Sequence, residues 1–412
     1  MVGFSNFEIE ERVDDSFVQM KIVKKQTENP HLTKAILPQM KNRIAGYDLA
    51  RALSLFGMLM VNNWVLFEDV NSDPGWQLAF LNIIQGRAAA LFVVLAGIGI
   101  SLLSRQAYLN KDTVAMQAIR RSMLKRALFL FVIGLLNRIL WPADILHFYG
   151  VYFAIGVLLI TVSNLRLGIL AIPPIAAFSI LSFLIGFDRS WDWEGNSLKA
   201  FLNVPGILSH LFFSGQYPVF PWLVFLMIGM WLGRQNVYNR GFRRRCLLAG
   251  LGAFVSAETV SWMAFRVSDL RLFGFNLAEF LPWIANIDPW EPMPLFVLSA
   301  IGTSLTLIIL SILVAERFKN STWLLAFSAL GQLTLTLYVV HILLGWIVVL
   351  IMEMFEWHVT LFTLWGSGIF YLEGMLFAYQ WKKHHERGPL EWVMRRFAQY
   401  SIQPKTAVPV QA

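Results

Sequence analysis

Ten long apolar segments, joined by charged loops, are the feature that most constrains the fold of this chain. A helix of about 20 apolar residues is long enough to cross the hydrocarbon core of a bilayer. We therefore predict an all-α fold, a polytopic membrane helix bundle of about ten transmembrane helices. The predicted spans lie near residues 47–67, 85–104, 126–142, 145–163, 167–187, 218–234, 246–265, 293–314, 330–350 and 359–380.

Composition supports a membrane protein and excludes several other classes. Charged residues make up only 15% of the chain, whereas a soluble domain usually has about 25%. The net charge of +8 does not indicate a nucleic-acid partner, because the basic residues fall in short loops. The single cysteine, Cys246, excludes an intramolecular disulfide framework. His384 and His385 are adjacent in a basic segment, and we expect no metal site there.

The loop charges predict the orientation of the bundle. With the N-terminus in the cytosol, the cytosolic loops hold the excess of Lys and Arg that the positive-inside rule requires. Both termini are then cytosolic, and we expect the bilayer to be a bacterial inner membrane. The predicted parts are a flexible cytosolic tail (1–40), a transmembrane domain (41–380) and a basic cytosolic tail (381–412).

Two outer loops are longer than the others. Residues 188–217 and 266–292 are rich in Trp, Phe and Pro, with scattered acidic residues. They are expected either to line the mouth of a substrate site or to be ordinary connections with interfacial aromatic side chains.

A histidine near the middle of one apolar segment is the first candidate functional residue. His341 lies about halfway through the predicted span 330–350, where an ionisable side chain is costly and needs a function or a specific partner. Thr334 and Tyr338 precede it at helical spacing, so the three share one polar face with Gly331 and Gly345. The alternative is a histidine that bonds across helices and only holds the bundle together.

A second polar cluster lies at the outer turn between two predicted spans. Asp144 and His147 are three residues apart and share a helix face, and Asn137 and Arg138 precede them. A carboxylate beside an imidazole orients the ring and suits a general base. The alternative is that Asp144 is only a cap at the start of a helix.

Other charged residues occur at or within the predicted spans. Arg87 lies either at the outer interface or, if its span begins near Leu78, at mid-membrane with an obligatory partner. Glu258 lies within another span, where a structural hydrogen bond is the expected role.

The cytosolic end of the first span carries charged residues in close succession. Asp48 and Arg51 are one helical turn apart and can pair with each other, and Arg43 lies just outside the span. These residues either anchor the helix by snorkelling or contact the phosphates of a cytosolic donor.

Several motifs resemble one family of membrane acyltransferases. The first span, with Asp48, Arg51, Gly57 and Asn62, is similar to that of YeiB-like proteins and of heparan-α-glucosaminide N-acetyltransferase relatives. Further similar segments are GRAAALFVVLAGIGISLL, DILHFYG, LTLTLYVVH and RGPLEWVMRR, and together they extend from about Lys41 to Arg396.

The resemblance implies transfer of an acyl group, with acetyl expected, from cytosolic acyl-CoA to a sugar or envelope glycan outside. His341 or His147 would be the general base, with Asp144 orienting His147. The other residues that it suggests are Arg87, Arg138, Tyr338 and Thr334 for substrate, and Arg43, Asp48 and Arg51 for acyl-CoA.

One departure from the family is visible in the sequence. The heparan enzyme is associated with a histidine in the outer loop after the first span, and the matching stretch EDVNSDPGWQLAF has none. His147 is the nearest outer-facing substitute. The lipid bilayer and a carbohydrate or glycolipid acceptor are the expected partners, with a homodimer left open.

Two rival interpretations remain open at this point. A transporter or flippase of a lipid-linked or small anionic solute would use the same arginines as its binding site. Broken helices with Gly or Pro at matched positions would favour this interpretation, but Pro173-Pro174 has no evident counterpart and no internal repeat is evident. A structural assembly factor without chemistry is the third interpretation.

Overall fold

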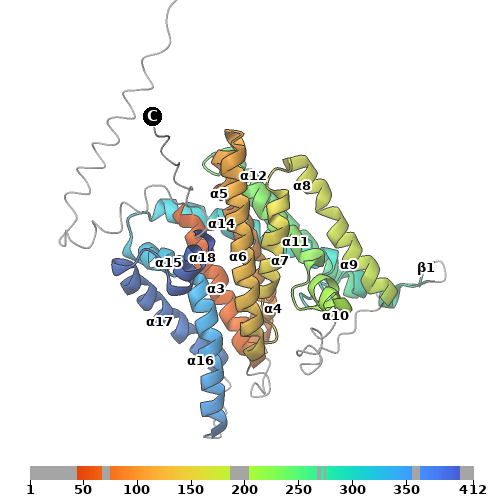
Figure 1. The fold of residues 1–412 in the computed structure, drawn as a ribbon. Helices are drawn as coiled ribbons and strands as arrows, with labels where there is room; N and C mark the ends of the chain where they lie inside the picture. The colour runs from red at the N-terminus through yellow and green to blue at the C-terminus, as the bar shows by residue number, and fades with distance from the viewer. Residues whose placement is uncertain are drawn as a thin grey trace, which may run out of the picture.

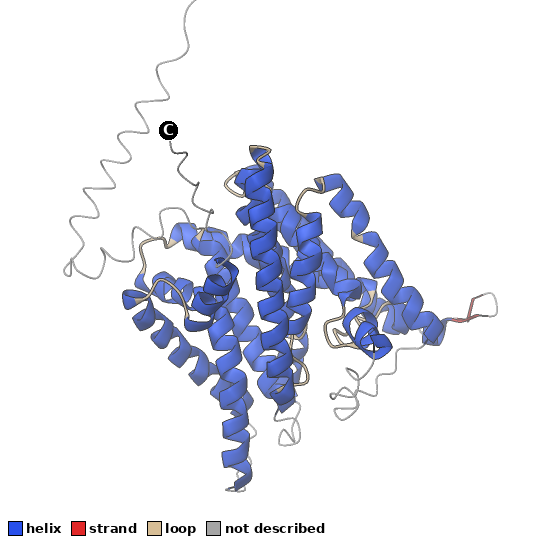
Figure 2. Cartoon of the chain, in the orientation of Figure 1, coloured by secondary structure: helices blue, strands red, loops and turns tan. Residues whose placement is uncertain are grey.

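The computed structural model describes residues 44–66, 75–185, 204–266, 271–272, 275–354 and 362–399. These residues form a helix bundle, with one two-stranded antiparallel ribbon, β1 and β2, at its edge (Figures 1 and 2). The all-α prediction is therefore confirmed. The elements are α3 (Ala45–Leu66), α4 (Gly75–Ile84), α5 (Arg87–Leu109), α6 (Thr113–Leu140), α7 (Leu146–Leu159), α8 (Asn164–Leu170), α9 (Ile172–Ile185), α10 (Val204–Ser209), the π-helix η3 (His210–Ser214), α11 (Val219–Gly233), α12 (Arg240–Arg266), β1 (Arg271–Leu272), β2 (Phe275–Asn276), α13 (Leu277–Ile284), α14 (Pro294–Arg317), α15 (Thr322–Gln332), α16 (Thr334–Met354), α17 (Phe362–His384) and α18 (Pro389–Gln399).

The predicted count of about ten spans is not confirmed. In the described part of the chain, six helices are long and apolar enough to cross a membrane, or seven if a bent pair counts as one span. Helix α6 is not among them because Lys125, Arg126 and Arg138 fall in its most apolar stretch, residues 123–140. Helix α7 has only 14 residues, about 21 Å of helix, which is shorter than the hydrocarbon core.

One predicted loop is partly helical. Residues 204–214, expected within an outer connection, form α10 and η3, which join α11 at a bend of 54°. These helical turns are hard to predict because Pro205, Gly206 and Pro218 are residue types typical of turns. Because of the bend, η3 packs against α11. His210, the first residue of η3, is therefore buried inside the protein and only 2% exposed.

The bundle centre is built on close backbone contacts between α5 and α11. A Cβ atom on Gly97 would lie 2.1 Å from the Leu226 carbonyl oxygen, and one on Gly229 would lie 2.0 Å from that of Val94. Only glycine allows this approach. Gly99, two residues further along α5, has nothing within 4 Å of its Cβ position and lines a cavity.

A Gly229→Ala variant is expected to lose about 1–3 kcal/mol of stability, because the added methyl group forces α5 and α11 apart. The measurement is thermal unfolding of the detergent-solubilised protein. Gly252→Ala is the matched control, since its Cβ position on α12 is open. Equal melting temperatures of the two variants would contradict the proposed contact.

The end of the described chain is part of the bundle. Helix α18, from the predicted C-terminal tail, packs against α6 and α16 (Figure 1). The Glu391 carboxylate accepts hydrogen bonds from the backbone N–H groups of Leu335 (2.8 Å) and Thr336 (3.1 Å) and from the Thr336 hydroxyl (2.6 Å). Glu391 therefore caps the start of α16, the helix that carries His341.

Candidate functional site

An interior cavity of about 250 Å³ lies between helices α3, α5, α6, α7, α16 and α18. Its wall is mainly apolar, with a few polar groups at each end, which is the usual composition of a small-molecule site. The residues at its two ends are Arg51, Leu103, Arg126, Glu391 and Met394 at one, and Phe92, Ile145, Leu146, Tyr149 and Tyr338 at the other.

The first end carries two arginines and reaches the protein surface, since Leu103 is 42% exposed. Arg51 donates to Asp48 at 2.7 Å, as its spacing predicted. Asp48 is buried and also accepts from the Gln332 side chain at 2.9 Å, so it holds Arg51 and joins α3 to the α15–α16 break. Arg43 lies outside the described residues.

Arg126, the first residue of the predicted span 126–142, lines the same interior cavity as Arg51. Its Nε atom has no hydrogen-bond partner among the described residues. Glu391, on α18, is the acid at this end, and burial raises its pKa although the Leu335 and Thr336 donors oppose that shift. Helix α6 begins 13 residues earlier than its predicted span (113 instead of 126), so Arg126 lies in the middle of the helix and not at its start.

Replacement of Glu391 by alanine is expected to cost about 1 kcal/mol, because two N–H groups of α16 lose their acceptor. Glu391→Gln, which keeps an acceptor oxygen, should retain most of the stability, and Glu386→Ala at an exposed position is the control. Thermal unfolding in detergent measures all three. If Glu391→Ala and Glu386→Ala melt together, the cap contributes nothing.

The second end of the cavity is formed by two tyrosines and the start of α7. The Tyr338 hydroxyl accepts a hydrogen bond from the Ile145 backbone N–H at 3.4 Å and faces the Asp144 carboxylate. The Tyr149 hydroxyl is buried and has no hydrogen-bond partner in the part of the chain that the structure describes. A buried hydroxyl in a cavity wall without a partner is a group that a ligand can satisfy.

Directly behind Ile145 and Leu146 lies the predicted Asp144–His147 pair. Asp144 Oδ1 accepts from the Asn137 amide at 2.7 Å, and Oδ2 accepts from the Leu146 backbone N–H at 2.7 Å. The Nδ1 atom of His147 lies 3.3 Å from the same Oδ2. Both interpretations of Asp144 are thus realised, because it caps α7 and also orients the imidazole.

The other nitrogen of His147 faces a residue that sequence reasoning missed. His147 Nε2 lies 3.2 Å from Nε2 of His210, and Arg138 Nη1 lies 2.6 Å from the same His210 atom. A guanidinium group only donates, so His210 Nε2 is the acceptor. His147 is therefore held between a carboxylate and a second imidazole, an arrangement suited to accepting and passing on a proton. The sequence placed His210 in an outer loop.

His341 occupies a different place from His147. Its Nε2 atom accepts a hydrogen bond from the Asn62 side-chain amide at 3.1 Å, and its ring packs against Tyr338 with centroids 5.1 Å apart. It lies inside the bundle, as the polar stripe predicted, and 4% of it is exposed. Thr334 and Tyr338 line the interior cavity, whereas His341 lies behind Tyr338.

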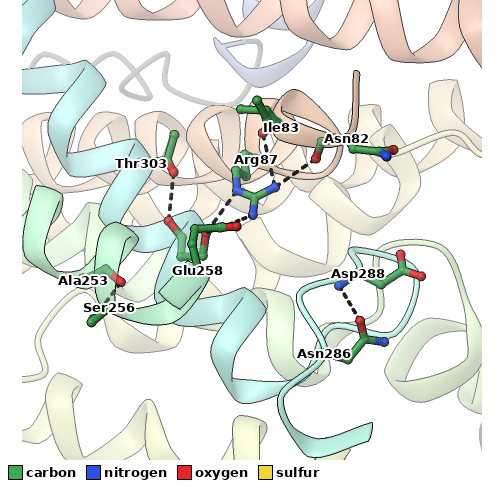
Figure 3. Close-up of polar contacts among 10 residues, drawn as sticks. Asn82, Ile83, Arg87, Ala253, Ser256, Glu258, Asn286, Asp288 and Thr303 are labelled. Atoms are coloured by element: carbon green, nitrogen blue, oxygen red, sulfur yellow. Dashed lines mark hydrogen bonds and ion pairs between the residues drawn. The ribbon is translucent and has the colours of Figure 1, made fainter. Parts of the chain in front are cut away.

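Arg87 is buried in a second cluster. Its Nη2 atom pairs with Glu258, its Nε donates to Ser299 at 3.1 Å, and its Nη1 donates to the Asn82 and Ile83 carbonyl oxygens (Figure 3). Residues Phe80–Leu109 pass as one candidate span, in which Arg87 is internal and has the partner that this depth requires. Within the described residues, no group of three or more His, Cys, Asp or Glu side chains could hold a metal ion.

Two family models match the chain, one over its first part and one over its second part. Residues 43–264 match the family model described as the catalytic part of heparan-alpha-glucosaminide N-acetyltransferase. Residues 235–401 match a family described as a protein of unknown function (DUF418), and the two matches overlap on α12. No curated protein matches the chain. The first match contains Asp144, His147 and His210, and the second contains Tyr338 and His341.

Proposed function

Because the chain belongs to the heparan-α-glucosaminide N-acetyltransferase catalytic family, we propose that it transfers an acetyl group from cytosolic acetyl-CoA to a sugar acceptor on the outer side of an inner membrane. The observation that carries this proposal is the interior cavity, which leads from two arginines to the wall in front of Asp144 and His147. The apolar helices and the membrane-enzyme family fit an integral membrane protein.

The residues around the cavity fit an acyl-CoA molecule. Arg51 and Arg126 are placed to bind phosphate groups at the exposed end. The apolar middle suits the pantetheine arm and acetyl group, and the Tyr149 hydroxyl is available to donate to the thioester carbonyl oxygen. In this assignment both arginines bind the acetyl-CoA donor. The proposed orientation has both chain termini on the cytosolic side, the side from which acetyl-CoA enters.

The transfer then proceeds at the inner end of the cavity. The acceptor hydroxyl or amine attacks the thioester carbon, a new C–O or C–N bond forms, and the C–S bond breaks. Tyr338 lines the cavity, and its hydroxyl accepts from the backbone N–H of Ile145, the neighbour of Asp144, so it is assigned to pass the acceptor proton toward Asp144 and His147. A proton returns by the same route, from His147 through Asp144 and Tyr338 to the CoA thiolate, which leaves as the thiol. Arg138 and His210 keep the His147 ring in position.

The test is transfer of labelled acetyl from acetyl-CoA supplied on the cytosolic side of proteoliposomes to a mixture of glycan acceptors. The proposal requires labelled sugar on the opposite side, and its absence with every acceptor and acyl-CoA tried would overturn it.

Arg126→Ala is expected to raise the KM for acetyl-CoA about tenfold or more with a smaller change in kcat, because a charged hydrogen bond to phosphate is lost. Arg121→Ala, at an exposed position on the same helix, is the matched control. An Arg126 variant with an unaltered KM for acetyl-CoA would remove the phosphate role.

A transporter is the second candidate, and one observation favours it. The chain segment Val204–Gly233 is broken by a 54° bend, the kind of discontinuous helix that transporters use at substrate sites. Uptake or efflux of an anionic solute in proteoliposomes without acyl-CoA would decide for this function.

A further inference from the structure

A second cavity, here called the polar cavity, has a volume of about 510 Å³ and a different chemistry from the interior cavity. It lies where α4 meets α5, against α12 and the turn before α14. Its lining residues are Asn82, Ile83, Gln85, Arg87, Phe254, Glu258, Phe265, Asn286, Ile287, Asp288, Pro289 and Trp290.

The walls of the polar cavity are fixed by contacts outside it. The Glu291 carboxylate accepts from the Ser182 hydroxyl at 3.1 Å and from the Trp283 indole at 2.9 Å, which anchors the turn. Gly86, with φ of +68°, lies so close to Pro289 that a Cβ atom would be 2.2 Å from it. The turn can therefore pack against the α4–α5 junction only because residue 86 is glycine. These contacts hold the walls of the polar cavity in place without a ligand.

The Arg87–Glu258 pair (Figure 3) lines the polar cavity with both residues, and the carboxylate is the more exposed partner. The side chain of Arg87 is 4% exposed, whereas that of Glu258 is 32% exposed. Glu258 Oε1 bonds to Arg87 and accepts from the Ser299 hydroxyl at 2.7 Å, while Oε2 has no hydrogen bond among the described residues. Arg87 thus holds Glu258 in place and balances its charge.

The remaining polar groups select the ligand. The side-chain amides of Asn82 and Gln85 form no hydrogen bonds within the described part of the chain, so they can both donate and accept. Asp288 adds a second carboxylate, which makes the lining unfavourable for an anion. Amides, carboxylates and an aromatic wall with Trp290 match the hydroxyl groups and apolar ring faces of an uncharged sugar.

We propose that the polar cavity binds a neutral sugar residue of the acceptor glycan, with Glu258 accepting hydrogen bonds from its hydroxyl groups. The proposal rests on the proposed acyl transfer for the identity of the glycan as acceptor. Both cavities adjoin α5, where Arg87 of the polar cavity precedes Phe92 of the interior cavity by about 8 Å along the helix axis.

The experiment measures equilibrium binding to the full-length protein in lipid nanodiscs, without any acyl donor. The probes are three neutral disaccharides (maltose, cellobiose and N,N′-diacetylchitobiose), a sulfated heparin disaccharide and 1,4-diaminobutane. We expect at least one neutral disaccharide to bind, and Glu258→Gln and Gln85→Ala each to weaken it about tenfold or more. Arg244→Ala, remote from this cavity, should bind like the wild type.

The outcomes separate the two proposals. Tighter binding of the sulfated disaccharide or the diamine, no binding of any neutral disaccharide, or unaltered binding by both variants would overturn the sugar site. Because Glu258→Gln still offers an oxygen to Arg87, and Gln85→Ala leaves the ion pair intact, a folding defect cannot mimic the result in both. Sugar binding by a wild-type protein that transfers no acetyl group would overturn only the acyltransferase function.

Discussion

Replacement of His147 by alanine is expected to lower the rate of acetyl transfer by about 10²- to 10⁴-fold, the usual contribution of a positioned general base. The reason is its position between Asp144 at Nδ1 and His210 at Nε2, in a fully buried site next to the cavity wall. The measurement is kcat for labelled acetyl transfer in proteoliposomes, at saturating acetyl-CoA.

Three comparison variants make this result specific. His384→Ala removes an exposed histidine and should leave kcat unaltered. His210→Ala should lower kcat less than His147→Ala, because His210 acts through His147. His341→Ala decides between the two candidate bases, since a larger loss there would assign the proton transfer to the residue bonded to Asn62. Unaltered activity in both His147→Ala and His341→Ala would remove the proposed chemistry.

Replacement of Arg87 by methionine is expected to destabilise the protein by about 3 kcal/mol, because it leaves the Glu258 carboxylate within a membrane helix without its cation. The lower end of the range for buried pairs applies, since about a third of the Glu258 side chain is exposed. Unfolding of the detergent-solubilised protein, followed by tryptophan fluorescence, measures the change.

The double variant Arg87→Met with Glu258→Leu separates the ion pair from packing. It should regain most of the lost stability, because no buried charge is then left without a partner. Arg121→Met, at an exposed position, is the control for loss of an arginine. If the single and double variants unfold alike, the Arg87–Glu258 pair is not the source of the effect.

The family motifs, far apart in the sequence, meet in the structure. Asn62, at the end of the first motif, donates to His341 of the late motif, and Gly331 approaches the Asp48 backbone so closely that a Cβ would be 1.9 Å from its carbonyl oxygen. Glu391, from the C-terminal motif, caps the helix that carries His341. These contacts give a structural reason for residue types that the sequence could only match to a family.

Several features could be predicted from local sequence because they depend on local distances. The Asp48–Arg51 and Asp144–His147 pairs are each three residues apart. Helical geometry forms the first pair. The second forms because Asp144, just before α7, caps the first turn that carries His147. The all-α class followed from the length of the apolar segments. The number of spans could not be predicted in the same way. Whether a helix breaks, or keeps charged residues such as those of α6, depends on the neighbouring helices that pack against it.

The sequence by itself determined the membrane-helix class, the polar stripe on α16 and the carboxylate–imidazole pair. Composition, helical period and the capping of a first helical turn set these three features, and all of them are local. Only the tertiary structure decided three contacts. His210 lies beside His147, Arg126 lines the same cavity as Arg51, and Glu258 forms the ion pair with Arg87. Their separations along the chain are 63, 75 and 171 residues. No helical period links residues that far apart, and only the packing of whole helices brings their side chains together.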